Sequence, residues 1–126
     1  MLKINSVSLL LLLSLFLIGC QNNNLNLSGN VSSIEVYEWD SDEQIAIIED
    51  IEYIEELVIE LDNARTETTA NLDYELPDYE LLFKNDEETV FDIGYYNQLM
   101  NLGVEGRYLD VSEDLIYGLE LQLPLD

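Results

Sequence analysis

Apolar residues in the middle of the chain recur at every third or fourth position, which is the spacing of one helix face. Asp50 precedes this run and is a suitable N-cap residue. On the opposite side, Glu52 and Glu56 form a like-charge pair four residues apart, which destabilises an isolated helix by about 0.2–0.5 kcal/mol. We therefore predict a helix from Asp50 to Asn63 that depends on packing its apolar stripe against a sheet. The stripe consists of Ile51, Ile54, Leu57, Val58, Leu61 and Ala64.

Runs of alternating apolar and polar residues on both sides of this helix predict β-strands. Before the helix, Ser33–Trp39 and Gln44–Ile48 are separated by a short acidic turn, which indicates a hairpin. Because short turns join most of the strands, these should pair antiparallel. We predict an α+β fold, a twisted antiparallel sheet of five or six strands with one amphipathic helix packed on one face. The later strands are expected at Tyr79–Lys84, Val90–Tyr96, Gly106–Val111 and Leu115–Leu123, with loops at Arg65–Asp73 and Asn97–Gly103.

One helix leaves the second face of such a sheet short of cover, and several aromatic residues are candidates for that face. Tyr37, Trp39, Tyr96 and Tyr117 all lie in predicted strands or beside them. They are a candidate ligand platform, on which cation–π attraction would suit a basic ligand. The alternative is that most of them are core or edge residues, because tyrosine is favoured in strands.

The first twenty residues have the pattern of a secretory signal. Lys3 is followed by an apolar run from Val7 to Ile18, and the run ends at Gly19 and Cys20. It is too short to span a bilayer, which needs about 20 apolar residues. Leu17-Ile18-Gly19-Cys20 resembles a bacterial lipobox.

The resemblance to a lipobox implies signal cleavage between Gly19 and Cys20 and a diacylglycerol on the Cys20 sulfur. Two acyl chains hold a protein to a membrane far more firmly than one, since each buried methylene contributes about 0.8 kcal/mol. The expected location is the extracytoplasmic face of the cell membrane. Plain secretion and an uncleaved anchor helix are the alternatives.

These features divide the chain into three parts. Residues 1–19 are the expected signal peptide, residues 20–32 the lipidated cysteine with a polar, asparagine-rich flexible tether, and residues 33–126 a single domain. Since Cys20 is the only cysteine, no disulfide is available to the domain. Its stability must therefore come from packing.

The chain is strongly acidic after the expected cleavage point. All 27 acidic residues follow Cys20, whereas only Arg65, Lys84 and Arg107 of the basic residues do, which leaves 24 excess negative charges. Such a surface repels phosphate backbones and anionic lipids, so we expect no nucleic acid partner. The acidity suits capture of a cationic partner, or it is a solvated exterior of the kind found in salt- or alkali-adapted bacteria.

The residue inventory excludes several kinds of chemistry. The chain has no histidine and no second cysteine, which removes the common zinc sites and the triads that use imidazole. It also lacks a glycine-rich phosphate loop. Carboxylate pairs are too numerous for any one of them to indicate a glycosidase. We therefore predict a protein that is not an enzyme and that carries no cofactor and no catalytic or metal site.

Two acidic clusters deserve comparison with calcium sites. An EF-hand loop that began at Asp40 would need glycine at position six and glutamate at position twelve, where the chain has Ile45 and Ile51. Charged hairpin turns explain the clusters better, because aspartate and asparagine favour turns. The clusters are Asp40, Asp42 and Glu43, and Asp86, Glu87 and Glu88.

The exported part also resembles the small YhfM-like domains of Bacillus-type lipoproteins, whose role is not established. The resemblance is carried by five segments and covers most of the domain. It implies a fold but no catalytic residue. The segments are Ile47–Asn63, Leu76–Phe83, Phe91–Tyr95, Gly106–Leu109 and Ile116–Tyr117.

Two functions fit these observations. The first is a non-enzymatic binding or interaction module on the outer face of the cytoplasmic membrane, whose partner is another envelope protein. The second is an immunity or sequestering lipoprotein that captures a cationic antimicrobial peptide, with its charge raising the capture rate.

Overall fold

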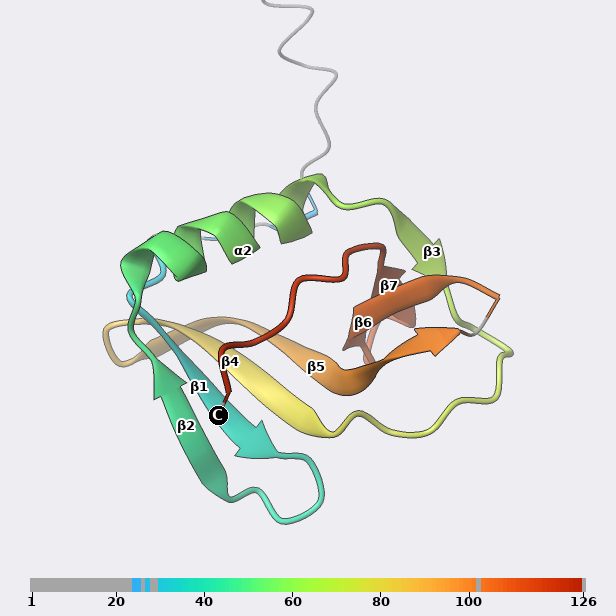
Figure 1. Ribbon diagram of the computed structural model, residues 1–126, viewed down its shortest axis with the longest axis horizontal. Helices are drawn as coiled ribbons and strands as arrows, with labels where there is room; N and C mark the ends of the chain where they lie inside the picture. The colour runs from blue at the N-terminus through green and yellow to red at the C-terminus, as the bar shows by residue number, and fades with distance from the viewer. Residues whose placement is uncertain (1–23, 26, 28–29, 102, 126) are drawn as a thin grey trace, which may run out of the picture.

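The computed structural model describes residues 24–25, 27, 30–101 and 103–125 of the chain (Figure 1). The predicted signal peptide and the lipid site at Cys20 lie outside the described residues. One antiparallel sheet has the strand order β2-β1-β4-β5-β6-β7-β3, and one helix packs on it. The elements in chain order are β1 (Ser33–Glu38), β2 (Gln44–Ile48), α2 (Ile51–Asn63), β3 (Thr66–Thr68), β4 (Tyr79–Asn85), β5 (Glu88–Asn101), β6 (Glu105–Asp110) and β7 (Leu115–Tyr117).

The α+β fold predicted from the sequence is confirmed, with seven strands in place of five or six. The additional strand is β3, which lies in the threonine-rich segment predicted to be a loop. β3 has only three residues and pairs with β7, so that Thr66 lies opposite Tyr117. A strand this short shows no period of its own, which is why the sequence pattern does not reveal it.

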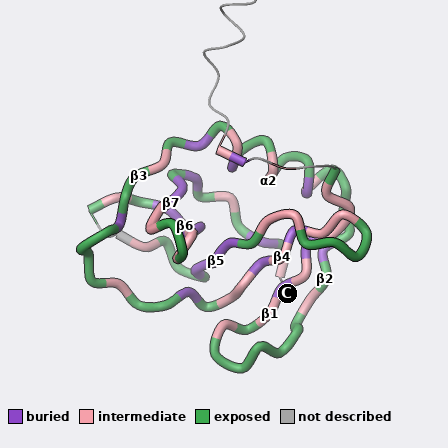
Figure 2. Tube along the Cα trace, turned by 180° about the vertical axis from the view of Figure 1, so that it is seen from behind, coloured by how far each residue is buried: buried purple, intermediate pink, exposed green. Residues whose placement is uncertain are grey.

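Helix α2 begins and ends where the pattern predicts. The Asp50 side chain accepts hydrogen bonds from the backbone N–H groups of Glu52 and Tyr53, at 3.1 and 3.5 Å. The buried side chains of the helix are Ile54, Leu57 and Leu61, and each fully buried side chain of this size contributes about 1.5–3 kcal/mol. Figure 2 shows buried residues along α2 and the central strands, whereas the turn between β1 and β2 is largely exposed. We call the face of the sheet that packs on α2 the inner face, and the opposite one the outer face.

Strand β5 carries the chain from one half of the sheet to the other. Its pairing with β6 shifts register between Tyr95 and Met100, which marks a bulge that bends the strand. The predicted loop over Asn97–Gly103 is therefore wrong for its first part, because β5 continues to Asn101. The bulge interrupts the alternation of apolar and polar side chains along β5. The sequence pattern at this point therefore resembles that of a loop.

The end of the chain does not extend the last strand as predicted. β7 ends at Tyr117, and the following residues run between α2 and the inner face of the sheet (Figure 1). Leu119 and Leu123 are buried there. Three tyrosine hydroxyls bind the backbone of this segment: Tyr108 donates to Leu121 O at 2.6 Å, Tyr53 donates to Gln122 O at 2.9 Å, and Tyr95 accepts from Leu123 N at 3.2 Å.

Part of the predicted tether is packed on the domain. The Asn24 side chain donates to the carbonyl oxygens of Leu61 and Ala64, at 2.8 and 2.7 Å. Leu25 is buried, and its N–H donates to the Asp62 side chain at 2.9 Å. The prediction of a flexible tether over residues 20–32 is therefore wrong for Asn24 and Leu25. The carbonyls at the end of a helix need hydrogen-bond donors, and an asparagine that looks like linker in the sequence supplies them here.

Within the described part of the chain, no helix has the length and apolar character that would let it cross a membrane.

Candidate functional site

The loop between β3 and β4 covers half of the outer face. It lies over β5, β6 and β7, where Tyr96, Leu109 and Ile116 form a small second core. Tyr96 donates its hydroxyl to Glu75 O at 2.6 Å, and Tyr74 donates to the Asp114 carboxylate at 3.3 Å. These bonds hold the loop against the sheet.

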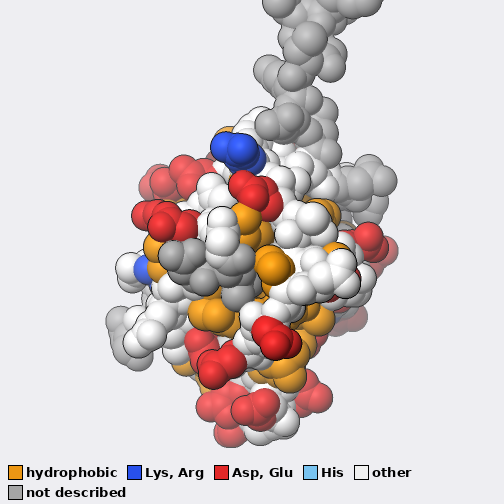
Figure 3. Space-filling view, turned by 90° about the vertical axis from the view of Figure 1, so that its right-hand side faces the viewer, with side chains coloured by type: hydrophobic (Ala, Val, Ile, Leu, Met, Phe, Trp, Pro, Cys, Tyr) orange, Lys and Arg blue, Asp and Glu red, His pale blue; other side chains and the backbone are white. Residues whose placement is uncertain are grey.

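The other half of the outer face, over β1 and β4, carries acidic and aromatic side chains. Tyr37 lies opposite Glu80, and Glu35 lies opposite Leu82. Tyr37 donates its hydroxyl to the Glu35 carboxylate at 2.7 Å, and this bond is the main cause of the raised pKa of Tyr37. Figure 3 shows acidic side chains spread over one side of the molecule, with hydrophobic side chains between them.

A cavity of about 340 Å³ lies where the open half meets the covered half, and we call it the outer pocket. Its walls combine one indole ring with three carboxylates, from Glu80 on β4, Asp92 on β5 and Asp110 at the end of β6. Burial, and then the negative charges of Asp92 and Asp42, raise the pKa of Glu80. A bound cation would relieve this repulsion. The lining residues are Trp39, Glu80, Asp92, Ile93, Gly94, Asp110, Val111 and Ser112.

Gly94 allows the loop to approach the floor of this pocket. A Cβ atom at Gly94 would lie 2.4 Å from Cγ of Pro77, which is too close for any side chain. Pro77 is buried, and the next residue, Asp78, donates its N–H to Tyr95 O at 3.0 Å. The loop is therefore fixed beside the pocket by a contact that only glycine permits without movement.

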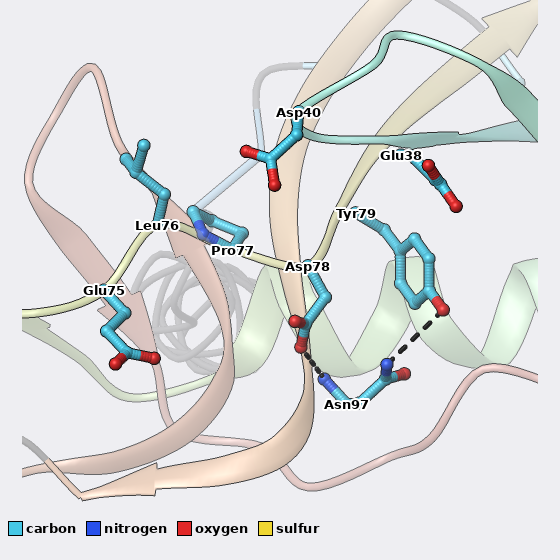
Figure 4. A pocket seen from close by; sticks show the side chains of 8 residues that line it. All are labelled: Glu38, Asp40, Glu75, Leu76, Pro77, Asp78, Tyr79 and Asn97. Atoms are coloured by element: carbon cyan, nitrogen blue, oxygen red, sulfur yellow. Dashed lines mark hydrogen bonds between the residues drawn. The ribbon is translucent and has the colours of Figure 1, made fainter.

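A second cavity, of about 510 Å³, lies on the other side of the segment that contains Pro77, and we call it the rim pocket. Figure 4 shows the carboxylates of Glu38, Asp40, Glu75 and Asp78 around it. Asp78 accepts a hydrogen bond from the backbone N–H of Asn97 at 2.8 Å. The remaining lining residues are Leu76, Pro77, Tyr79 and Asn97.

No lysine or arginine lines either pocket. Lys84 donates to Thr89 Oγ1 at 2.8 Å, and Arg107 donates to the carbonyl oxygens of Asn97 and Glu120. Among the residues that the structure describes, the one ion pair joins Arg65 to Glu67 at 3.8 Å, and both side chains are exposed. Asp110 accepts hydrogen bonds from the Ser112 hydroxyl at 2.8 Å and from the Glu113 N–H at 3.2 Å, and both donors are neutral. No basic side chain in the lining of either pocket neutralises its carboxylates.

The structure brings together only part of the predicted ligand platform. Tyr37 lies opposite Glu80 on the outer face. Trp39 lines the outer pocket together with Glu80. Tyr96 and Tyr117 are each only 3% exposed and belong to different clusters, the second core and the main core. These two side chains are on opposite faces of the sheet, so the four aromatic residues do not form one surface.

Of the acidic residues that line the pockets, the sequence pattern singles out only Asp40, as part of a cluster interpreted as a turn. The sequence offers too many acids to choose the others. The alternation in β4 does place Glu80 on the polar face, but its proximity to Asp92 and Asp110 depends on long-range strand pairing. No local pattern marks that proximity.

The two clusters compared with calcium sites form turns. Asp42 and Asp86 have positive φ angles of 57° and 56° in the turns that follow β1 and β4. Aspartate tolerates this conformation better than most residues. Within the described ranges, no three or more acidic, histidine or cysteine side chains are arranged to hold a metal ion.

No protein family, curated protein or solved structure matches this chain. The resemblance to the YhfM-like domains stays an expectation, and the site must be interpreted from its own geometry.

Proposed function

We propose that this protein is a lipoprotein on the extracytoplasmic face of the cytoplasmic membrane and acts there as a non-enzymatic binding module. The signal pattern over residues 1–19 and the lipobox-like sequence that ends at Cys20 support the anchor. Attachment through lipid also suits a domain whose own charge would be repelled by anionic head groups.

The ligand class that fits best is an organic cation, such as a basic peptide or an amine. The observation that carries this proposal is the outer pocket, where Trp39 and three carboxylates share one cavity without a neighbouring basic side chain. An ammonium or guanidinium group would gain both charge-assisted hydrogen bonds and cation–π attraction there. The acidic rim pocket provides a second contact within the same region of the domain.

The second candidate function, sequestration of a cationic antimicrobial peptide, is favoured by the excess of 24 negative charges. A field of this strength raises the association rate of a basic peptide, and the effect falls as salt increases. A deletion strain should then be more sensitive to cationic peptides, whereas unchanged sensitivity to a broad panel of them would contradict this candidate and leave the envelope-partner function.

The anchor is tested by labelling growing cells with a radioactive fatty acid and separating their membranes. The protein should be labelled and should fractionate with the membrane, and Cys20→Ser should lose both properties. An unlabelled protein, or a serine variant that remains in the membrane, would contradict the lipoprotein assignment.

The ligand class is tested by titrating the full-length protein with spermine and with an arginine-rich peptide. The double variant Glu80→Gln, Asp92→Asn should bind about tenfold more weakly. The control is Glu55→Gln, Glu56→Gln, which removes the same two charges from exposed positions on α2. Equal losses in both variants would mean that the cations bind the overall charge and not the pocket.

A further inference from the structure

The two edges of the sheet differ in how well they are protected against pairing with another strand. The β3 edge has only three residues and carries the charged Glu67. The β2 edge has five residues, Gln44–Ile48, and none of them is charged or proline. Natural sheets protect edges with short strands, charges, prolines and bulges, because unpaired backbone groups bind other strands.

Of these protective features, β2 has only a bulge, and the bulge affects only one end of the strand. The pairing with β1 shifts register between Val36 and Tyr37, so a bulge disrupts the start of β2. From Ala46 to Ile48 the pairing is regular. The opposite side of this stretch faces no strand of the sheet.

The side chains on β2 are also unusually apolar for an exposed edge. Ile45 is 41% exposed and Ile47 is 50% exposed, which is more than most hydrophobic side chains of the domain. A strand added beside β2 would cover both. Main-chain bonds to the edge would supply affinity, and contacts with these two side chains would supply selectivity.

The charges around β2 determine what kind of strand would pair there. Asp42 and Glu43 precede the strand, Glu49 and Asp50 follow it, and Glu35 lies opposite Ile47 on the neighbouring strand. A second copy of this chain would bring the same acids against them. An extended peptide with apolar residues in its middle and lysine or arginine near its ends would instead be complementary along the whole edge.

We propose that the β2 edge binds an extended basic peptide as an eighth strand of the sheet. This inference rests on the proposed function for the cationic class of ligand, and it assigns the peptide backbone to an edge that lies apart from both pockets.

The test measures hydrogen–deuterium exchange of the full-length protein in detergent, with a peptide that has valines in its middle and lysines at both ends as the probe. Amide exchange within residues 46–48 should slow by about tenfold or more when the peptide binds. The same peptide with alternate backbone nitrogens methylated keeps every charge but loses donors for a strand pair, so it should give no protection.

Two variants with the same change in net charge provide the matched comparison. Ile47→Lys places a charge on the edge and should weaken binding about tenfold, whereas Ile59→Lys, at a 60% exposed position on α2, should change it less than about twofold. Equal effects of the two variants, or peptide binding without protection of β2, would overturn the edge inference and leave the cation-binding function intact. Absence of binding by this peptide would also overturn the edge inference, and absence of binding by spermine and the arginine-rich peptide as well would overturn the proposed ligand class.

Discussion

The hydroxyl of Tyr108 donates a hydrogen bond to the carbonyl oxygen of Leu121 across the interior of the domain, at 2.6 Å. Tyr108 is fully buried, and burial raises the pKa of its hydroxyl, which therefore stays protonated and remains a donor at neutral pH. Through this bond, and those of Tyr53 and Tyr95, a chain end without strand partners becomes part of the core.

Removing the Tyr108 hydroxyl should destabilise the protein. Tyr108→Phe takes the hydroxyl donor away from the partly buried Leu121 carbonyl, and we expect a loss of about 1–2 kcal/mol in the free energy of unfolding. Urea denaturation measures it. Tyr37→Phe is the control, since Tyr37 bonds to Glu35 near the surface, and it should cost less than Tyr108→Phe. Equal losses would contradict a special role for the buried bond.

Removing the Asn24 side chain should weaken the end of α2. Asn24→Ala deletes two hydrogen bonds to Leu61 and Ala64, and we expect a loss of about 1–2 kcal/mol together with faster amide exchange at residues 24 and 25. Asn30→Ala, at an exposed position nearby in the chain, serves as the control and should be nearly neutral. A neutral Asn24→Ala would show that the packing of Leu25 and the backbone hydrogen bonds to Asp62 hold the segment.

A methyl group at Gly94 should displace the loop that carries Pro77. Gly94→Ala places a Cβ atom 2.4 Å from Pro77 Cγ and 2.9 Å from its Cβ, and we expect a cost of about 1–3 kcal/mol. Pro77→Gly removes both clashing atoms. In a double-mutant cycle, Gly94→Ala should therefore cost less in the Pro77→Gly background, and strict additivity of the two changes would contradict the contact.

The pH dependence of stability should depend on Glu80. Its pKa in the folded protein is raised above the ordinary value of 4.5, so the folded state binds a proton more readily than the unfolded state. The charged form therefore destabilises the fold above this pKa, and protonation relieves that effect as the pH falls. We expect Glu80→Gln to be more stable than the parent at pH 7, with the difference shrinking as the pH falls toward 4.5.

Unfolding curves of the two proteins between pH 7 and pH 4 test this sign. Glu87→Gln, at an exposed position in the turn between β4 and β5, is the control and should gain less stability at pH 7 than Glu80→Gln. A Glu80→Gln variant that is less stable than the parent at pH 7 would show that the carboxylate makes a favourable contact in the outer pocket.

The sequence predicts those parts of the fold that depend on residues close together along the chain. Asp50 and the apolar stripe specify α2 locally, and the helix begins and ends as expected. In the alternating run after Leu115, Tyr117, Leu119 and Leu123 are buried, whereas Leu121 is only partly buried. Alternation does not say what the backbone bonds to. In this protein the partners are tyrosine hydroxyls far away in the sequence.

The candidate site is harder to predict for a related reason. Trp39 is one of four aromatic residues that the strand pattern indicates as candidates for the uncovered face, whereas Glu80, Asp92 and Asp110 are three of 27 acids. These three acids lie close together because β4 pairs with β5 and β5 pairs with β6, and because β5 contains a bulge. Only the register of these strands distinguishes them from the other carboxylates.

The hydrogen bonds of Asn24 also limit how far the domain can stand from its proposed anchor. Three residues separate Cys20 from Asn24, and four Cα–Cα steps of about 3.8 Å span at most about 15 Å. A lipid on Cys20 would keep the carbonyl end of α2 beside the bilayer. The turn between β1 and β2, at the far end of the domain in Figure 1, would then point away from the cell surface toward arriving ligands.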